Sequence, residues 1–288
     1  MTLEIIVVVL ALAFLQIWGA NNPLHSDQWF YRWSHYVRDW SFGNAEWRTF
    51  LSVALPLLLV LIINEVLASQ SIWITLPFVV LVLLYSFGRG EFFAFVRSYT
   101  QACYVEDWDS ATQRALQFQV NLDDVERDDW ASLHQHVLDE AAYRGFERLF
   151  AVLFWFLVLG PVGALMYRLV FLLLKQQTDS QQTGTAGQAL LERWQFLLDW
   201  PAVRVLGITF AMTGNFSSSF EQWKVCFFCR VRSAREVLRL TIIGALSAND
   251  VLPHSCEITR KELSMMVKLY QRSLWFWVAG VSFIALFI

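Results

Sequence analysis

The sequence predicts an all-α membrane protein with about six transmembrane helices, and two observations support this class. Of the 288 residues, 56% are hydrophobic and 16% are charged, whereas soluble domains carry about 25% charged residues. The apolar residues also gather in runs close to the roughly 17–25 residues that a helix needs to cross the hydrocarbon core. No long linker separates these runs, so we expect a single integral domain over residues 1–288.

Five apolar runs are predicted spans from their composition, and they cover 2–18, 50–67, 72–87, 149–174 and 273–288. The first run lacks the basic flank and the cleavage site of a signal peptide, so we expect it to be retained as a helix. A further run, 194–213, is apolar but contains Asp199, Pro201 and Arg204. Hydropathy alone does not decide whether this run crosses the membrane.

The distribution of Lys and Arg decides the question, because cytoplasmic loops carry an excess of both. If 194–213 crosses, the segments 19–49, 88–148 and 214–272 are cytoplasmic and hold eighteen basic residues, while the external loops hold two. If it does not cross, the nine basic residues of 214–272 lie on the external side of the membrane, against this rule. The count therefore predicts six spans, with both termini in the periplasm.

The cytoplasmic segments are expected to be helical. Within 19–49, "DQWFYRWSHYVRDW" is typical of an amphipathic helix on the inner surface, with Trp and Tyr as anchors. The segments 88–148 and 214–272 contain apolar residues at helical spacing. In the second of these, Arg232, Arg235 and Arg239 share a helical face that suits acidic lipid headgroups or, alternatively, a bound phosphate.

Asp199 and Pro201 predict a break in their span, because Asp is a preferred N-cap and Pro is tolerated in the first helical turn. Arg204 costs at least about 2.5–3.5 kcal/mol if it faces lipid at the membrane centre, so we expect it to face the helix bundle. Asp199 is its partner only if a bend brings the two together; Glu4 and Glu65 are alternatives. Arg204 is interpreted either as a structural residue that fixes the packing of its span or as part of a ligand site.

Few patterns indicate catalysis or metal binding. The only CxxC is "CFFC" at 226–229, and without a second pair it is read as reduced thiols, with a redox role as the alternative. His134 and His136 point to different faces of a helix, so no metal site is expected. No nucleotide loop, nucleophile elbow or zinc-protease motif occurs. We therefore assign no catalytic residue, and a net charge of −3 gives no reason to expect nucleic acid.

Four stretches in order carry a family resemblance. They are "MTLEIIVVVLALAFLQIWG" at the start, "YTQACYVEDWDSATQRA" (99–115), "FAVLFWFLVLGPVGALMYRLV" (150–170) and "LLDWPAVRVLGITFAMTGNF" (197–216). Together they resemble the AmpE family of bacterial inner-membrane proteins, which are encoded beside an anhydro-muropeptide amidase in β-lactamase regulation. AmpE is a distant relative of the CobD/CbiB adenosylcobinamide-phosphate synthases.

The departures from the synthases are as informative as the matches. Their polar "ENxSDG" run is replaced here by residues 143–148, "YRGFER", and their "PNAG" loop by residues 232–237, "RSAREV". The resemblance thus implies a non-enzymatic sensor or modulator linked to cell-wall stress, with no cofactor and with a membrane or periplasmic protein partner. An ATP-dependent amide ligase or transferase is the first alternative, and a small transporter is the second.

The candidate binding residues follow from this comparison. A cytoplasm-facing polar pocket would be lined by Glu140, Arg144, Glu147, Arg148 and Arg204. Asp199 is added because ionisable residues within a membrane are functional candidates by default. Arg232, Arg235 and Arg239 form the candidate interaction surface.

Overall fold

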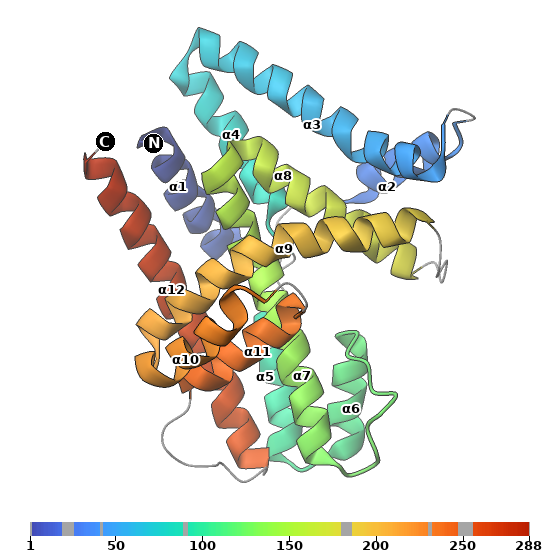
Figure 1. Cartoon of the computed structure of the whole chain (residues 1–288), viewed down its shortest axis with the longest axis vertical. Coiled ribbons are helices and arrows are strands. Elements are labelled where there is room, and N and C mark those ends of the chain that lie inside the picture. Colours follow the sequence, from blue (N-terminus) through green and yellow to red (C-terminus); the bar gives the residue numbers. More distant parts are fainter. Residues whose placement is uncertain are drawn as a thin grey trace. The chain divides into compact units, whose positions relative to one another are not determined.

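The computed structural model describes residues 2–18, 26–40, 43–88, 92–179, 186–229, 232–246 and 256–287, and within these ranges every regular element is a helix (Figure 1). The all-α prediction is therefore confirmed. The chain forms two compact units. Unit 1 comprises Met1–Arg89, Arg148–Ala202 and Val281–Ile288, and unit 2 comprises Gly90–Glu147 and Val203–Gly280.

Five helices lie wholly in unit 1: α1 (Thr2–Trp18), α2 (Gln28–Arg38), α3 (Ala45–Gln70), α4 (Ile72–Ser86) and α8 (Val152–Asp179). Five lie wholly in unit 2: α5 (Phe92–Tyr104), α6 (Trp108–Gln117), α7 (Trp130–Gly145), α10 (Phe216–Phe227) and α11 (Ala234–Leu246). The π-helix η1 (Phe146–Ala151), α9 (Ala186–Thr213) and α12 (Cys256–Phe287) contribute residues to both units.

Three helical stretches among the described residues are long and apolar enough to cross a membrane: Ala45–Gln70, Trp130–Gln177 and Gly187–Thr213. Two shorter apolar helices cover Glu4–Ile17 and Ile72–Ser86. Large side chains on α3 face outward, with Leu58 and Leu59 more than half exposed, as lipid contact requires. These features identify a membrane protein, whereas the count of six spans stays a prediction.

The core of unit 1 lies where α2, α3, α8 and the first half of α9 meet. Its buried members are Phe30, Val53, Leu165, Leu169, Val170, Leu172, Leu173 and Leu191. Trp33 closes one edge and donates from Nε1 to the backbone oxygen of Ser52 at 3.0 Å. α4 packs against α1, α3 and α8. The apolar faces of these helices thus bury one another, while many side chains of α3 remain exposed.

A break interrupts α8 at Gly160. This residue has φ 65° and ψ −153°, which are not helical angles, and Pro161 follows it. The conformation is essentially restricted to glycine, and proline supplies no N–H to continue the preceding turn. The predicted span 149–174 is therefore two helical pieces that meet at an angle.

The predicted break at Asp199 and Pro201 is wrong, because α9 is helical from Ala186 to Thr213. Proline removes one hydrogen bond, to the carbonyl of Leu197, and the helix continues through it. The neighbouring carbonyl of Leu198 accepts a hydrogen bond from Trp155 Nε1 at 3.0 Å. α8 thus contacts α9 beside the proline, and the helix is not interrupted there.

Unit 1 also corrects the predicted sidedness of two segments, 19–49 and 175–193. Ser34 Oγ of α2 donates to Gln176 Oε1 of α8 at 2.9 Å, and Gln176 Nε2 lies 3.0 Å from His35 Nε2. A Cβ added at Gly187 would lie 3.1 Å from Thr49 Oγ1. Segments in direct contact cannot lie on opposite faces of a bilayer, so the two assignments cannot both hold. The break at Gly160 is the physical reason, because the second half of α8 turns to run beside α2 and α3.

Unit 2 contains the helices expected in 88–148 and 214–272. Asp107 caps α6, and hydrogen bonds from the Ser110 hydroxyl and backbone N–H lower the pKa of its carboxyl group. Asp129 caps α7 by accepting from the Ser132 N–H at 3.1 Å. α10 and α11 pack closely, since a Cβ at Gly244 would lie 2.8 Å from the Ser219 Cα. The cytoplasmic location of these helices stays a prediction.

Candidate functional site

Acidic residues of α7 meet basic residues of α11 inside unit 2. The α7–α11 charged cluster consists of Asp139, Glu140, Arg144, Arg235 and Arg239. Glu140 is 7% exposed and accepts hydrogen bonds from Arg144 Nε at 2.7 Å and from Arg235 Nη1. Asp139 pairs with Arg239 at 3.4 Å. One buried carboxylate is thus shared between two guanidinium groups.

Helix geometry explains this pairing. Arg235 and Arg239 are four residues apart, so they project from one face of α11. Glu140 and Arg144 have the same spacing on α7, and their ion pair lies within that helix. Burial of Glu140 is tolerable because charge-assisted hydrogen bonds satisfy both of its oxygens.

Aromatic rings cover the two arginines that bind Glu140. The Arg235 guanidinium lies 4.3 Å from the centre of the Tyr143 ring, and that of Arg144 lies 5.6 Å from the Phe118 ring. Arg144 also donates to Gln119 Oε1 at 2.8 Å. Half of the Arg235 side chain remains exposed. Arg235 is therefore the most exposed arginine of the cluster, and the one that an incoming anion reaches most readily.

α12 holds the opposite side of α7 in place. The Tyr270 hydroxyl donates to the Ala142 carbonyl at 2.6 Å, and a Cβ at Gly145 would lie 3.2 Å from the Tyr270 ring. His134 forms a hydrogen bond with Glu262. These contacts fix the face of α7 that lies away from α11, so the cluster has a rigid support.

Asp199 has partners within unit 1. It is 4% exposed, and it accepts from the Tyr167 hydroxyl at 2.8 Å and from Gln195 Nε2 at 3.0 Å. The predicted N-cap role is wrong because Asp199 lies inside α9. Its carboxylate instead links α9 to α8.

Arg204 has partners within unit 2. It is 3% exposed, and its Nε donates to the Phe227 carbonyl at 2.9 Å while Nη2 donates to the Cys229 carbonyl. Its own carbonyl accepts from Trp223 Nε1 at 2.9 Å. A cation at the carbonyl end of a helix is favourable, so Arg204 anchors the C-terminus of α10. Both alternatives for Arg204, a structural role and a ligand site, stay predictions.

The other predicted site residues are divided between the units. Glu147 is buried in η1 within unit 2, whereas Arg148 belongs to unit 1, where its carbonyl accepts from the Gly88 N–H at 3.0 Å. Arg232 lies 3.2 Å from Cys226 Sγ and 3.4 Å from Glu236. Because Arg235 and Arg239 pair with α7, the expected basic face is largely neutralised.

Two charged features were not predicted from the sequence. Asp139 pairs with α11 but was not among the candidates. In unit 1, Asp27 and Arg168 form an ion pair at 3.3 Å, and both are less than 5% exposed. Arg168 gave a usable signal, because an arginine inside the apolar run 149–174 requires a partner.

A chain whose described elements are all helices, with apolar helices of membrane length and internal ion pairs, is a polytopic membrane protein. It belongs to the AmpE family, described as "Regulatory signalling modulator protein AmpE", which matches residues 1–269. A cobalamin biosynthesis protein CobD of Chromobacterium violaceum is 23% identical over 171 residues. That match covers 52% of this chain and 53% of the relative, so the chain spans about half the length of the curated relative it matches. No solved structure matches the chain.

Proposed function

We propose that this protein is a non-enzymatic modulator of the bacterial inner membrane that responds to cell-wall stress and alters β-lactamase induction. The observation that carries the proposal is the AmpE family match over residues 1–269. Family membership makes the chain a regulatory membrane protein. The link to β-lactamase and to the inner membrane comes from the resemblance.

The α7–α11 charged cluster is the element that we propose responds to the signal. Glu140 is shared between Arg144 and Arg235, and Arg235 is half exposed. An anionic ligand or an acidic segment of a partner protein can compete for Arg235 and release it from Glu140. Regulation requires such a differential contact between two states.

The test is complementation in a strain that lacks this gene and carries an inducible β-lactamase. We expect the wild-type chain to restore the wild-type induction response, and Arg235→Gln to fail at equal membrane abundance. Arg97→Gln is the matched control, since Arg97 is an exposed arginine on α5 of the same unit. Equal induction with and without the gene would overturn the proposal.

An ATP-dependent amide ligase is the second candidate, and the 23% identity to a CobD protein is the observation in its favour. In this chain, however, the positions that replace the polar run of the synthases serve packing: Tyr143 and Phe146 are buried, and Gly145 lies against Tyr270. Saturable ATP binding by the purified protein, lost in Arg204→Ala, would favour the ligase. The third candidate, a transporter, requires muropeptide uptake into proteoliposomes.

A further inference from the structure

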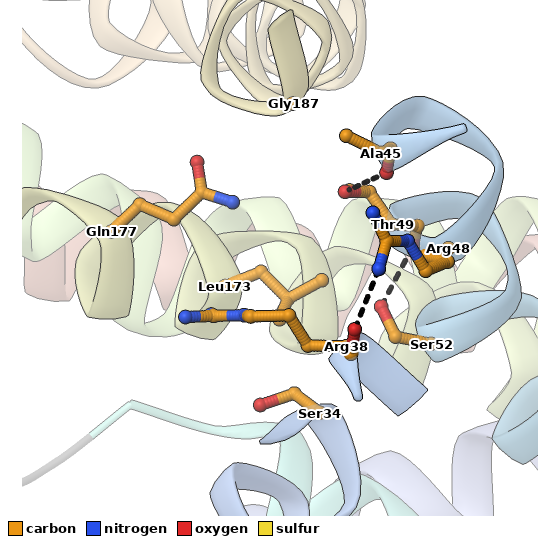
Figure 2. A pocket seen from close by; sticks show the side chains of 9 residues that line it. All are labelled: Ser34, Arg38, Ala45, Arg48, Thr49, Ser52, Leu173, Gln177 and Gly187. Atoms are coloured by element: carbon orange, nitrogen blue, oxygen red, sulfur yellow. Dashed lines mark hydrogen bonds between the residues drawn. The ribbon is translucent and has the colours of Figure 1, made fainter. Parts of the chain in front are cut away.

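A cationic pocket lies within unit 1, where α2, α3, α8 and α9 come together. Its volume is about 240 Å³, and its lining residues are Ser34, Arg38, Ala45, Arg48, Thr49, Ser52, Leu173, Gln177 and Gly187. Figure 2 shows Gln177 on one side of the cavity, Arg48, Thr49 and Ser52 on the other, and Gly187 above them. Among the described residues, the lining contains two arginines and no acidic residue.

The charge of these arginines is not neutralised by the described part of the chain. Arg48 Nη1 donates to the carbonyls of Arg38 at 2.7 Å and Trp40 at 3.2 Å, which fixes the guanidinium group in place. Its Nε is buried and has no hydrogen-bond partner among the described residues. Neither Arg38 nor Arg48 forms an ion pair with a described carboxylate. A fixed, buried donor with uncompensated charge favours an anion.

The rest of the lining suits a ligand that also carries hydroxyl groups. The side chains of Thr49 and Ser52 donate to the backbone carbonyls of Ala45 and Thr49, so their oxygens keep lone pairs for an incoming donor. Gln177 Oε1 is buried without a hydrogen-bond partner in the described structure. These acceptors complement the two cationic donors.

Aromatic residues place the pocket beside the membrane interface. Trp33 and Tyr36 of α2 and Trp40, just past its end, pack on one another with ring centres 5.8–6.3 Å apart. Trp29 and Tyr36 are 44% and 62% exposed. Exposed Trp and Tyr on an amphipathic helix lie at the level of lipid headgroups. An interfacial position of α2, as its sequence predicts, would place the pocket at the depth of the headgroup phosphates.

We propose that this pocket binds the phosphate ester of a small polyol, of the glycerol-phosphate type, between Arg38 and Arg48. Ligand pockets for drug-sized molecules measure about 300–1,000 Å³, so this smaller cavity suits a headgroup-sized ligand. The same chemistry is present in an anionic phospholipid headgroup and in a soluble glycerol phosphate. The site is independent of the proposed regulatory function.

The experiment uses the purified full-length protein and has two arms. In the first, glycerol 3-phosphate is titrated into protein in a neutral detergent and followed by calorimetry. In the second, native mass spectrometry counts lipids retained from nanodiscs of phosphatidylglycerol or of zwitterionic phosphatidylcholine. We expect one saturable site, with the affinity lowered at least about tenfold in Arg38→Gln through loss of a charge-assisted contact.

Arg32→Gln is the matched control, because it removes the same charge from an exposed position of α2 outside the pocket. Retention of phosphatidylglycerol without glycerol 3-phosphate binding identifies a lipid site, and the reverse identifies a soluble ligand. Absence of saturable binding in both arms overturns the proposal. An equal loss in Arg32→Gln and Arg38→Gln also overturns it, because only general surface charge would then be involved.

Discussion

Charged residues buried in the apolar helices hold the protein together through specific partners. Asp27 pairs with Arg168, Asp199 accepts from Tyr167, and Arg204 donates to carbonyls at the end of α10. A buried charge without a partner costs several kcal/mol. Each of these side chains therefore fixes one helix against another element of its own unit.

Glu140 provides the sharpest stability prediction at this scale. Its loss leaves Arg144 and Arg235 without their shared carboxylate, but both arginines are partly exposed and can be hydrated. We expect Glu140→Gln to lower the free energy of unfolding by about 1–3 kcal/mol, which is less than the roughly 3–5 kcal/mol for breaking a fully buried pair. Denaturation in detergent measures the change.

Glu221→Gln is the control for this prediction, since Glu221 is an exposed glutamate of α10 in the same unit. Its change in unfolding free energy should stay within about 0.5 kcal/mol. Similar values for the two variants would show that the α7–α11 charged cluster does not stabilise the fold.

At the scale of elements, Arg204 connects two helices of unit 2. It binds carbonyls at the C-terminus of α10, next to Cys226, which is fully buried. We expect Arg204→Leu to loosen this turn and to raise the rate of maleimide labelling at Cys226 at least about tenfold, since hydrogen bonds to a charged group contribute about 1.5–3 kcal/mol. The assay uses a background in which the other cysteines are serine.

Arg97→Gln serves as the control for the labelling assay, because it removes an exposed charge elsewhere in unit 2. Unchanged Cys226 labelling in Arg204→Leu would show that α10 holds its end without this residue. Membrane insertion of both variants should match that of the wild type.

Gly160 allows the break that divides α8 into two helical pieces. At φ 65° and ψ −153° any other residue is strained, and a Cβ there would meet no atom within 4 Å. We expect Gly160→Ala to destabilise the protein by about 1–3 kcal/mol through backbone strain alone. A thermal melt in detergent tests this expectation.

Gly280→Ala is the matched control, since its Cβ also meets nothing and the residue lies in a regular helix. Alanine there should be neutral or stabilising by up to about 1 kcal/mol. If both variants melt alike, the break in α8 does not depend on glycine.

The helices themselves could be predicted from apolar runs, but their breaks could not be predicted with the same success. Pro201 indicated a break, yet α9 is helical on both sides of it, and Trp155 and Tyr167 contact α9 just before the proline. The Gly160–Pro161 pair is a stronger helix breaker, but it lies inside a long hydrophobic run that predicts one continuous span. Hydropathy indicates whether a segment enters the membrane, but it does not indicate whether the helix is broken within that segment.

The members of the α7–α11 charged cluster were candidates for different reasons. Glu140 and Arg144 were expected in a polar pocket and Arg235 on a basic surface, whereas the structure pairs Glu140 with both arginines. Their mutual pairing depends on which helices pack, and a single sequence does not specify this. Basic residues were therefore expected to face lipid, whereas α7 supplies the carboxylates that neutralise them.

At the scale of the whole molecule, contacts within unit 1 bear on which face of the membrane each loop occupies. The basic-residue count placed 19–49 and 175–193 on opposite faces, but Ser34 and Gln176 are hydrogen-bonded within unit 1. We expect reporters fused after Gly43 and after Gly184 to report the same compartment. A paired alkaline phosphatase and fluorescent-protein assay reads this directly, because each reporter is active on only one side. Opposite signals from the two fusion sites would contradict the packing of α2 against α8 and restore the topology that the basic residues indicate.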